Sequence, residues 1–452
     1  MEGLCKRMKV RKGYLYIIEL YLFSILVGLI SFMFIDNNFL HTIYVTVTSI
    51  ALISTIIYNR KNVIRPLTFL IISFLAFLWM RIVLNVIYGS SVISVGKGIT
   101  DRNINIVTLY LGITGCTICG LAIIISEYFS HKHITIIKKH SKVTTNQIWI
   151  HRTLFFMALA FFALFLYDSY KKMGIVRTHN YLNVSENILL MGYRYFTIGK
   201  WILLLWLVIS KNKNRFMIGS TVLVIASAGY LMRGARGYAI CYFFLWLMIY
   251  SIKHKIKIRY LVVIGISLIF LANFILEYRL GWSVANGFRN VIFSTLHQQG
   301  ASIEPVFGSV IFKDEILKEF SKIDLFKTGT YGVVVDRVRD TGFTSGGFGS
   351  SFFAESYFLG FPFGFIFHVL LALCVGIMEY AYNIIMKSKK NKPYAMLLIF
   401  MTTPNLIYVG RSSLHDYIFK TISTLIIIVI LYSFEKYSRC DNKIYNQIEY
   451  EE

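Results

Sequence analysis

Long apolar runs recur along the whole chain, separated by short connections that carry most of the charged residues. Each run has about 20 residues, the length that an α-helix needs to cross a bilayer. Helices satisfy their own backbone hydrogen bonds in lipid, and the sequence lacks the alternating strands of about ten residues that membrane barrels use. The pattern predicts an all-α polytopic integral membrane protein. Its transmembrane helices, about 12 in number, are expected near residues 14–34, 39–58, 67–88, 104–126, 148–166, 189–210, 216–232, 238–252, 260–277, 353–386, 394–410 and 413–434.

The predicted spans divide the chain into four parts. Residues 1–277 form an N-terminal bundle of about nine spans, residues 278–350 a large external loop, residues 351–434 a C-terminal bundle of about three spans, and residues 435–452 a cytoplasmic tail. Within the loop, apolar residues recur at helical spacing over residues 311–326, which predicts an amphipathic helix. This helix either lies over a site at the outer leaflet or packs without any part in chemistry.

The composition excludes a soluble domain and sets the orientation. Hydrophobic residues make up 56% of the chain and charged residues 15%, whereas soluble domains have roughly 25% charged residues. More than half of the 47 lysines and arginines lie in the two terminal segments and in alternate connections. This bias predicts cytoplasmic termini and an external position for residues 278–350. The net charge of +24 then reflects topology and affinity for anionic lipids, and does not indicate a nucleic-acid partner.

An arginine pair stands between two predicted spans, in the segment GYLMRGARGY from Gly229 to Tyr238. An arginine in the middle of a bilayer costs about 2.5–3.5 kcal/mol on insertion scales, so Arg233 and Arg236 are expected at an interface or a polar cavity. Guanidinium groups flanked by glycines suit an anionic ligand, because glycine lets the backbone come close to it. The alternative is a tight turn whose arginines only reach the lipid headgroups.

Glu355 lies where the chain returns to the membrane, in the glycine-rich segment from Thr341 to Gly364. Transfer of a carboxylate into an apolar segment disfavours its charged form, so the group exchanges a proton nearer to neutral pH, where a general base works best. The glycines before it either bring backbone amides to phosphate or sugar oxygens or simply admit the chain into the membrane. His297 is the rival base, since a neutral imidazole also accepts a proton near pH 7.

The sequence predicts no metal site and no cofactor. Cys116 and Cys119 form a CxxC pattern inside an apolar span, where packing thiols are expected. His131, His133 and His140 share a loop with lysines, whose charge repels a metal cation.

Four motifs follow one another in the second half of the chain: an RGxRG turn at Arg233 to Gly237, HQQGAS at His297 to Ser302, AESYFLGFPFG at Ala354 to Gly364, and a late Arg411. In this order they resemble the O-antigen and oligosaccharide repeat-unit polymerases of bacterial surface polysaccharide pathways, the Wzy type. The resemblance implies a multi-pass glycosyltransferase of the bacterial inner membrane with a GT-C-like architecture. It would join polyprenyl-diphosphate-linked oligosaccharides into an O-antigen or capsule, without a cofactor, in contact with membrane lipid and a chain-length regulator protein.

The resemblance and the residue chemistry together suggest roles. Negative charge grows on the diphosphate as the anomeric bond breaks, and fixed guanidinium groups stabilise it. The expected diphosphate contacts are Arg233, Arg236, Arg289 and Arg411. Glu355 or His297 is expected to accept the proton of the acceptor hydroxyl. The expected sugar contacts are Gln298, Gln299 and Trp282.

Two other functions fit parts of the same pattern. A ligase that moves the finished glycan to another acceptor needs the same arginines and base. A flippase for the lipid-linked unit needs cationic residues along a path inside the spans, a role open to Arg81, Arg152, Arg194, Lys200 and Lys420.

Overall fold

The computed structural model describes most of the predicted bundle. The described residues are 12–59, 62–89, 100–131, 147–178, 186–210, 212, 214–233, 236–254, 256–280, 291, 293, 296, 300–311, 313–314, 351–360, 362–387, 393–411, 417, 420–424 and 426–427. They form helices and connections without a β-strand.

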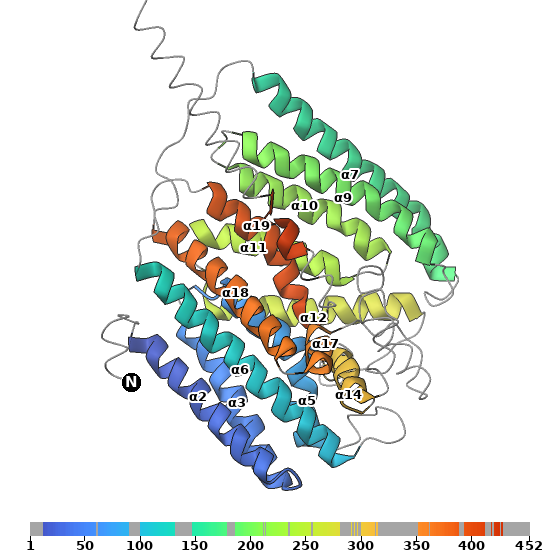
Figure 1. Ribbon diagram of the computed structural model, residues 1–452. Helices are drawn as coiled ribbons and strands as arrows, with labels where there is room; N and C mark the ends of the chain where they lie inside the picture. The colour runs from blue at the N-terminus through green and yellow to red at the C-terminus, as the bar shows by residue number, and fades with distance from the viewer. Residues whose placement is uncertain are drawn as a thin grey trace, which may run out of the picture.

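The helices form two neighbouring groups (Figure 1). The first group contains α2 (Lys12–Met33), α3 (Asn38–Tyr58), α6 (Asp101–His131) and α18 (Phe363–Lys387), with α6 packed against the other three. The second group contains α7 (Gln147–Thr178), α9 (Glu186–Ile209), α10 (Arg215–Met232) and α11 (Arg236–Lys253). Between them lies α19 (Pro393–Tyr408), which packs on both α11 and α18, while α12 (Ile258–Leu280) crosses the bundle in Figure 1.

The apolar runs become membrane-length helices. In the part of the chain that the structure describes, seven helices are long and apolar enough to cross a membrane, and three shorter apolar helices accompany them. This confirms the all-α polytopic membrane fold. The total of about 12 spans stays a prediction, because residues 413–434 are only partly described.

The single span predicted at residues 353–386 is wrong. Residues 353–386 do not form a single helix, because α17 (Phe352–Leu359) ends at Gly360 and α18 begins at Phe363. Gly360 has φ +66°, a conformation that favours glycine and terminates helices, and Pro362 follows it. The span predicted at 67–88 is continuous but irregular: α4 (Pro66–Phe74) and α5 (Met80–Tyr88) are joined by the π-helical segment η1 (Leu75–Trp79).

Two short elements belong to the predicted external loop. They are the 3-10 turn η3 (Gly300–Ile303) and α14 (Glu304–Ile311). The turn η3 packs on η1, and α14 packs on α17 and α6. The amphipathic helix predicted over 311–326 lies almost entirely outside the described residues. This described part of the predicted loop therefore packs directly against helices of the bundle.

Candidate functional site at one end of the bundle

Helix ends that are far apart in the sequence meet at one end of the bundle. After α19 the chain forms the 3-10 turn η4 (Val409–Arg411), in which the Gly410 N–H donates to Ser73 Oγ at 3.2 Å. Tyr408, the last residue of α19, stacks on Tyr238 in the first turn of α11, with ring centroids 5.5 Å apart. The turn η4 also packs on α17. Three segments predicted to carry the site, which contain Arg236, Arg411 and Glu355, therefore converge.

Glu355 lies in the first half of α17 and is buried, with 1% of its surface exposed. Its N–H donates to the Ser351 carbonyl at 3.1 Å, which forms the first helical turn. The elements around α17 are α14, α18 and η4, and the neighbouring Phe353 ring packs on Phe74 with centroids 5.5 Å apart. This packing places the helix that carries Glu355 next to η4, the turn that contains Arg411.

A buried polar cluster fixes α17 to α6 and α18. Tyr110 on α6 donates its hydroxyl to the Phe353 carbonyl at 2.8 Å and lies 2.8 Å from Ser356 Oγ. His368 Nε2 on α18 lies 2.8 Å from Ser356 Oγ and 3.2 Å from the Tyr110 hydroxyl. Because Ser356 directly follows Glu355, this cluster also sets the position of the Glu355 backbone. No local sequence pattern reveals this cluster, because its members are separated by up to 258 positions.

A buried ion pair joins the external loop to the bundle. Arg81 on α5 donates from Nη1 to Glu304 Oε1 at 2.6 Å, and 2% of the Arg81 side chain is exposed. Burial raises the pKa of the Glu304 carboxyl, and the Arg81 charge opposes that rise. Glu304 opens α14, which packs on α17. The pair thus holds the support of α17 in place.

Arg233 is fully buried, at 0% exposure, directly after α10. Its guanidinium forms an ion pair with Asp168 on α7, and its Nε donates to Ser169 Oγ at 2.8 Å. The rings of Phe165 and Tyr193 lie 5.0 and 5.1 Å from its central carbon, a cation–π arrangement on both rings. These contacts anchor the end of α10 to α7, and Asp168 was not predicted as a partner from the sequence.

The other predicted site residues are only partly placed. Arg236 is the first residue of α11 and Arg411 the last of η4. The remaining ones lie outside the described residues: Trp282, Arg289, His297, Gln298 and Gln299. Among the residues that the structure does describe, no three or more His, Cys, Asp or Glu side chains group in a way that could hold a metal ion.

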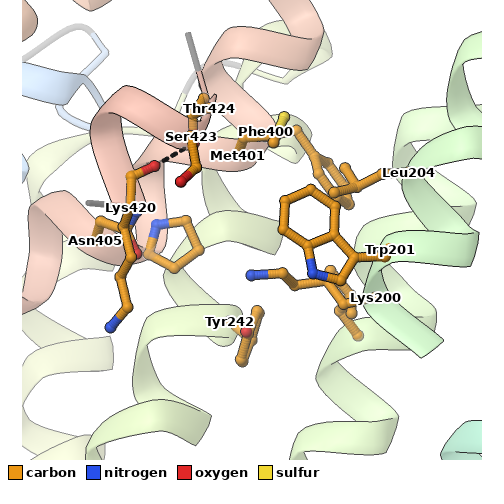
Figure 2. A pocket seen from close by; sticks show the side chains of 12 residues that line it. Lys200, Trp201, Leu204, Tyr242, Phe400, Met401, Asn405, Lys420, Ser423 and Thr424 are labelled. Carbon is orange, nitrogen blue, oxygen red and sulfur yellow. Dashed lines mark hydrogen bonds between the residues drawn. The ribbon is translucent and has the colours of Figure 1, made fainter. Parts of the chain in front are cut away.

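A cavity of about 170 Å³ lies between the second group of helices and α19 (Figure 2). Lys200 of α9 and Lys420 line it, together with Trp201, Tyr242 and Asn405. Figure 2 shows the two lysines on opposite sides of the cavity: the Lys200 side chain extends toward its middle, and the Lys420 side chain runs down along the other side. Two ammonium groups at one cavity inside an apolar bundle can hold an anionic or strongly polar group.

The five cations considered for a transport path do not share one location in the described part of the chain. Lys200 and Lys420 line the same cavity. Arg81 instead pairs with Glu304, and Arg152 and Arg194 are exposed on the surface of the helices.

Comparison with known proteins gives two matches. The family described as O-antigen polysaccharide polymerase Wzy matches residues 16–332. A protein of Escherichia coli described as an O-antigen polymerase is 37% identical over 267 residues, which are 58% of this chain and 60% of that relative. The chain thus aligns with less than two thirds of the relative's length. No solved structure matches. The family match includes Arg233 and Arg236 and ends before Glu355 and Arg411.

Proposed function

Because the chain belongs to the O-antigen polysaccharide polymerase Wzy family, we propose that it is a membrane glycosyltransferase that polymerises lipid-linked oligosaccharides. Its substrate would be a polyprenyl-diphosphate-linked repeat unit, and its product a surface polysaccharide such as an O-antigen or a capsule. The family match over residues 16–332 is the observation that carries this proposal. The membrane-length helices support it, because a lipid-linked substrate must be met within or beside the bilayer.

The reaction replaces one bond at the anomeric carbon by another. The bond between that carbon and the diphosphate oxygen breaks, and the diphosphate leaves on its lipid with the electron pair. A hydroxyl of the acceptor unit forms the new glycosidic bond and gives its proton to a general base. We propose Glu355 as this base, supported by its burial beside the converging helix ends. His297 remains the rival.

We propose that Arg236 and Arg411 receive the diphosphate, with Arg289 as a further contact. The convergence of α11 and η4 near α17 supports the first two. Arg233 was expected in the same role, but its ion pair with Asp168 and its full burial favour a positioning role, in which it holds the turn that leads to Arg236. Gln298, Gln299 and Trp282 remain the proposed sugar contacts.

The cellular setting is proposed on the same basis. The protein would lie in the bacterial inner membrane with both termini cytoplasmic and its site on the outer face. A chain-length regulator protein of the same pathway is the proposed partner, and GT-C-like is the proposed architecture.

The polymerase role can be tested by measuring the chain length of the surface glycan in cells that lack the gene for this protein. We expect such cells to attach single repeat units to the glycan acceptor, and re-expression to restore long chains. Accumulation of long lipid-linked chains with a bare acceptor would instead indicate a ligase. Retention of all repeat units inside the cell would indicate a flippase.

One observation favours the flippase as a second candidate. Lys200 and Lys420 come from different helices and line one cavity within the bundle, as a path for a diphosphate requires. Against it, the other three cations considered for such a path lie elsewhere. Replacement of both lysines by glutamine should stop delivery of repeat units to the outer face if the protein is a flippase, and should leave delivery unchanged if it is a polymerase.

A further inference from the structure

A second cavity, of about 310 Å³, lies between the first helical turns of α3 and α6 and the last turns of α5. Its volume is at the lower end of the range of about 300–1,000 Å³ that ligand pockets have. The lining is mostly polar: Asn38, His41, Thr42, Asn85, Asp101, Asn105 and Thr108. We call it the amide pocket after its three asparagines. None of the site residues predicted from the sequence lines it.

Two buried acceptors in the amide pocket lack a partner. His41 Nε2 lies 3.1 Å from the Ile35 carbonyl, and because a carbonyl only accepts, Nε2 must carry the proton. His41 Nδ1 is then an acceptor in the neutral ring, and it is buried without a hydrogen bond in a side chain that is only 4% exposed. Asn85 Oδ1 is likewise buried without a partner. Buried polar atoms are rarely left in this state, so a donor from outside the chain, a ligand or a water molecule, is expected to complete these hydrogen bonds.

The fixed groups around these acceptors show that the pocket is held in shape. Asn105 donates from Nδ2 to the Ile35 carbonyl at 2.8 Å and lies 3.3 Å from Asn38 Oδ1. The turn before α3 is closed by Asn37, whose side chain accepts from the N–H groups of Phe39 and Leu40. The His41 ring and the start of α3 therefore keep their positions when no ligand is bound.

The chemistry of the lining selects the ligand class. Free acceptors at His41, Asn85 and the Asp101 carboxylate suit a molecule that presents several hydroxyl donors. No lysine or arginine is among the lining residues, so neither a diphosphate nor an acidic sugar would find a counter-charge there. The remaining lining residues, which include Ile82 and Ile104, offer apolar contact to the C–H faces of a ring.

We infer that the amide pocket is a binding subsite for an uncharged sugar ring of the oligosaccharide repeat unit. The assignment rests on the proposed function for the identity of the oligosaccharide. The bound sugar would be one that lies far from the diphosphate end of the repeat unit, because no lysine or arginine lines the pocket to bind a diphosphate.

The position of the pocket connects it to the candidate site. Asn85 lies one turn beyond Arg81 on the same face of α5. Arg81 binds Glu304, which opens α14, and α14 packs on the helix that carries Glu355. The amide pocket is therefore linked through α5, the Arg81–Glu304 pair and α14 to the helix that carries Glu355.

Direct binding to the full-length protein in lipid nanodiscs tests the inference. The probe is the repeat-unit oligosaccharide released by mild acid from the lipid-linked intermediate of the source cell, so that it carries neither lipid nor diphosphate. Asn85→Leu keeps the side-chain volume and removes the unpartnered oxygen. We expect it to weaken oligosaccharide binding at least tenfold and to raise KM for chain extension without lowering kcat. Its thermal stability should be equal to the parent or higher, because an unsatisfied polar atom has been removed.

Asn103→Leu is the matched control, since Asn103 lies on α6 beside the pocket and does not line it. It should bind the oligosaccharide like the parent. If Asn85→Leu fails to fold, Asp101→Asn at the exposed rim takes its place with the same expected loss of binding.

Three results would overturn the inference: no binding of the oligosaccharide to the parent, parental binding by Asn85→Leu or its substitute Asp101→Asn, or an equal loss in Asn103→Leu. Failure of the proposed function is a separate result. A parent that binds the oligosaccharide in the amide pocket but never extends chains would refute the polymerase and leave the saccharide site standing.

Discussion

Glu355 and Arg233 are both buried, but they belong to different parts of the fold. Glu355 lies in α17, which packs on α14, α18 and η4. Arg233 has a carboxylate, a hydroxyl and two aromatic faces around its guanidinium. A buried charge with so complete a set of partners is typical of an anchor. Arg233 is therefore an anchor, and Glu355, on the helix beside η4, stays the proposed group that acts on substrate.

Glu355→Gln removes the titrating group and keeps the shape of the side chain. We expect normal abundance in the membrane and a loss of chain extension of about 10²- to 10⁴-fold, the usual contribution of a general base. The measurement is the rate of extension of lipid-linked repeat units by the purified variant. Glu19→Gln, at an exposed carboxylate on α2, is the control and should extend at the parental rate. Parental activity of Glu355→Gln would make His297 the leading base, to be tested by His297→Gln.

The Arg233→Lys variant shows whether Arg233 stabilises the fold or contacts the diphosphate. A lysine ammonium cannot contact Asp168 and Ser169 at the same time as the arginine guanidinium does. We therefore expect the free energy of unfolding to fall by about 2 kcal/mol. This is below the range of about 3–5 kcal/mol for breaking a buried pair, because 27% of the Asp168 side chain is exposed and Lys172 contacts it at 2.9 Å. Thermal unfolding in detergent measures the change.

Asp168→Asn should destabilise the protein in a similar way if the ion pair is an anchor. The double variant should then lose less than the two single losses combined. An Arg233→Lys protein of parental stability that has lost chain extension would instead support the direct diphosphate contact predicted from the sequence.

At the scale of elements, the break between α17 and α18 decides where Glu355 lies. Gly364, in the first turn of α18, packs directly against the Ser356 backbone, and its N–H donates to the Gly360 carbonyl at 2.6 Å. A side chain at Gly364 would collide with the Ser356 carbonyl oxygen. Only glycine lets the two helices approach this closely at that point.

Gly364→Ala should therefore displace α17 and with it Glu355. We expect a stability loss of about 1–3 kcal/mol from overpacking and a strong loss of chain extension. Gly265→Ala on α12 is the matched control, because nothing lies within 4 Å of the added carbon there. That variant should be as stable as the parent or more stable by about 0.5–1 kcal/mol. Equal behaviour of the two variants would show that the close approach of α17 and α18 has no role.

The sequence predicted the helices well and their junctions poorly, for physical reasons. Lipid forces an apolar run of about 20 residues to be a helix, so hydropathy alone identifies most of the spans. The break at Gly360 is hidden because Phe361 and Phe363 keep the run apolar, and hydropathy carries no information on a backbone angle.

The polar partners in the site could not be predicted from local patterns. Asp168 stands 65 positions from Arg233, and Glu304 stands 223 positions from Arg81. Only the packing of α7, α10, α5 and α14 brings them together. The sequence predicted that Arg236, Glu355 and Arg411 belong to one external site, and this stays a prediction. The structure shows only that η4 packs on α17 and that Tyr408 stacks on Tyr238 of α11.

For the whole molecule, the helix ends next to predicted external connections gather on one side of the bundle. In Figure 1, α2 and α7 finish and α6 begins toward the lower right, and α14 and α17 lie on that side as well. The amide pocket and the segment that contains Glu355 belong to this end. The distribution of lysine and arginine predicts that it faces outward.

Cysteine labelling tests that orientation. Asp36, in the turn between α2 and α3, and Asn212, between α9 and α10, are both exposed and stand at opposite ends of the bundle. In a background without the native cysteines, Asp36→Cys should react with a membrane-impermeant maleimide in cells whose outer barrier is permeabilised. Asn212→Cys should react only after lysis. Ser302 is unsuitable for this purpose because it is 3% exposed. The reverse labelling pattern would invert the topology and place the site in the cytoplasm.

Reconstitution of chain growth tests the polymerase proposal most directly. The purified full-length protein in nanodiscs is mixed with the lipid-linked repeat unit alone, without nucleotide sugar, ATP or a separate acceptor, and the glycans are resolved by size. We predict a ladder of lipid-linked chains that differ by one repeat unit, with one free polyprenyl diphosphate released for each bond formed. Repeat units that remain single, while the same protein preparation moves them across the bilayer or transfers them only to an added acceptor, would contradict the proposal.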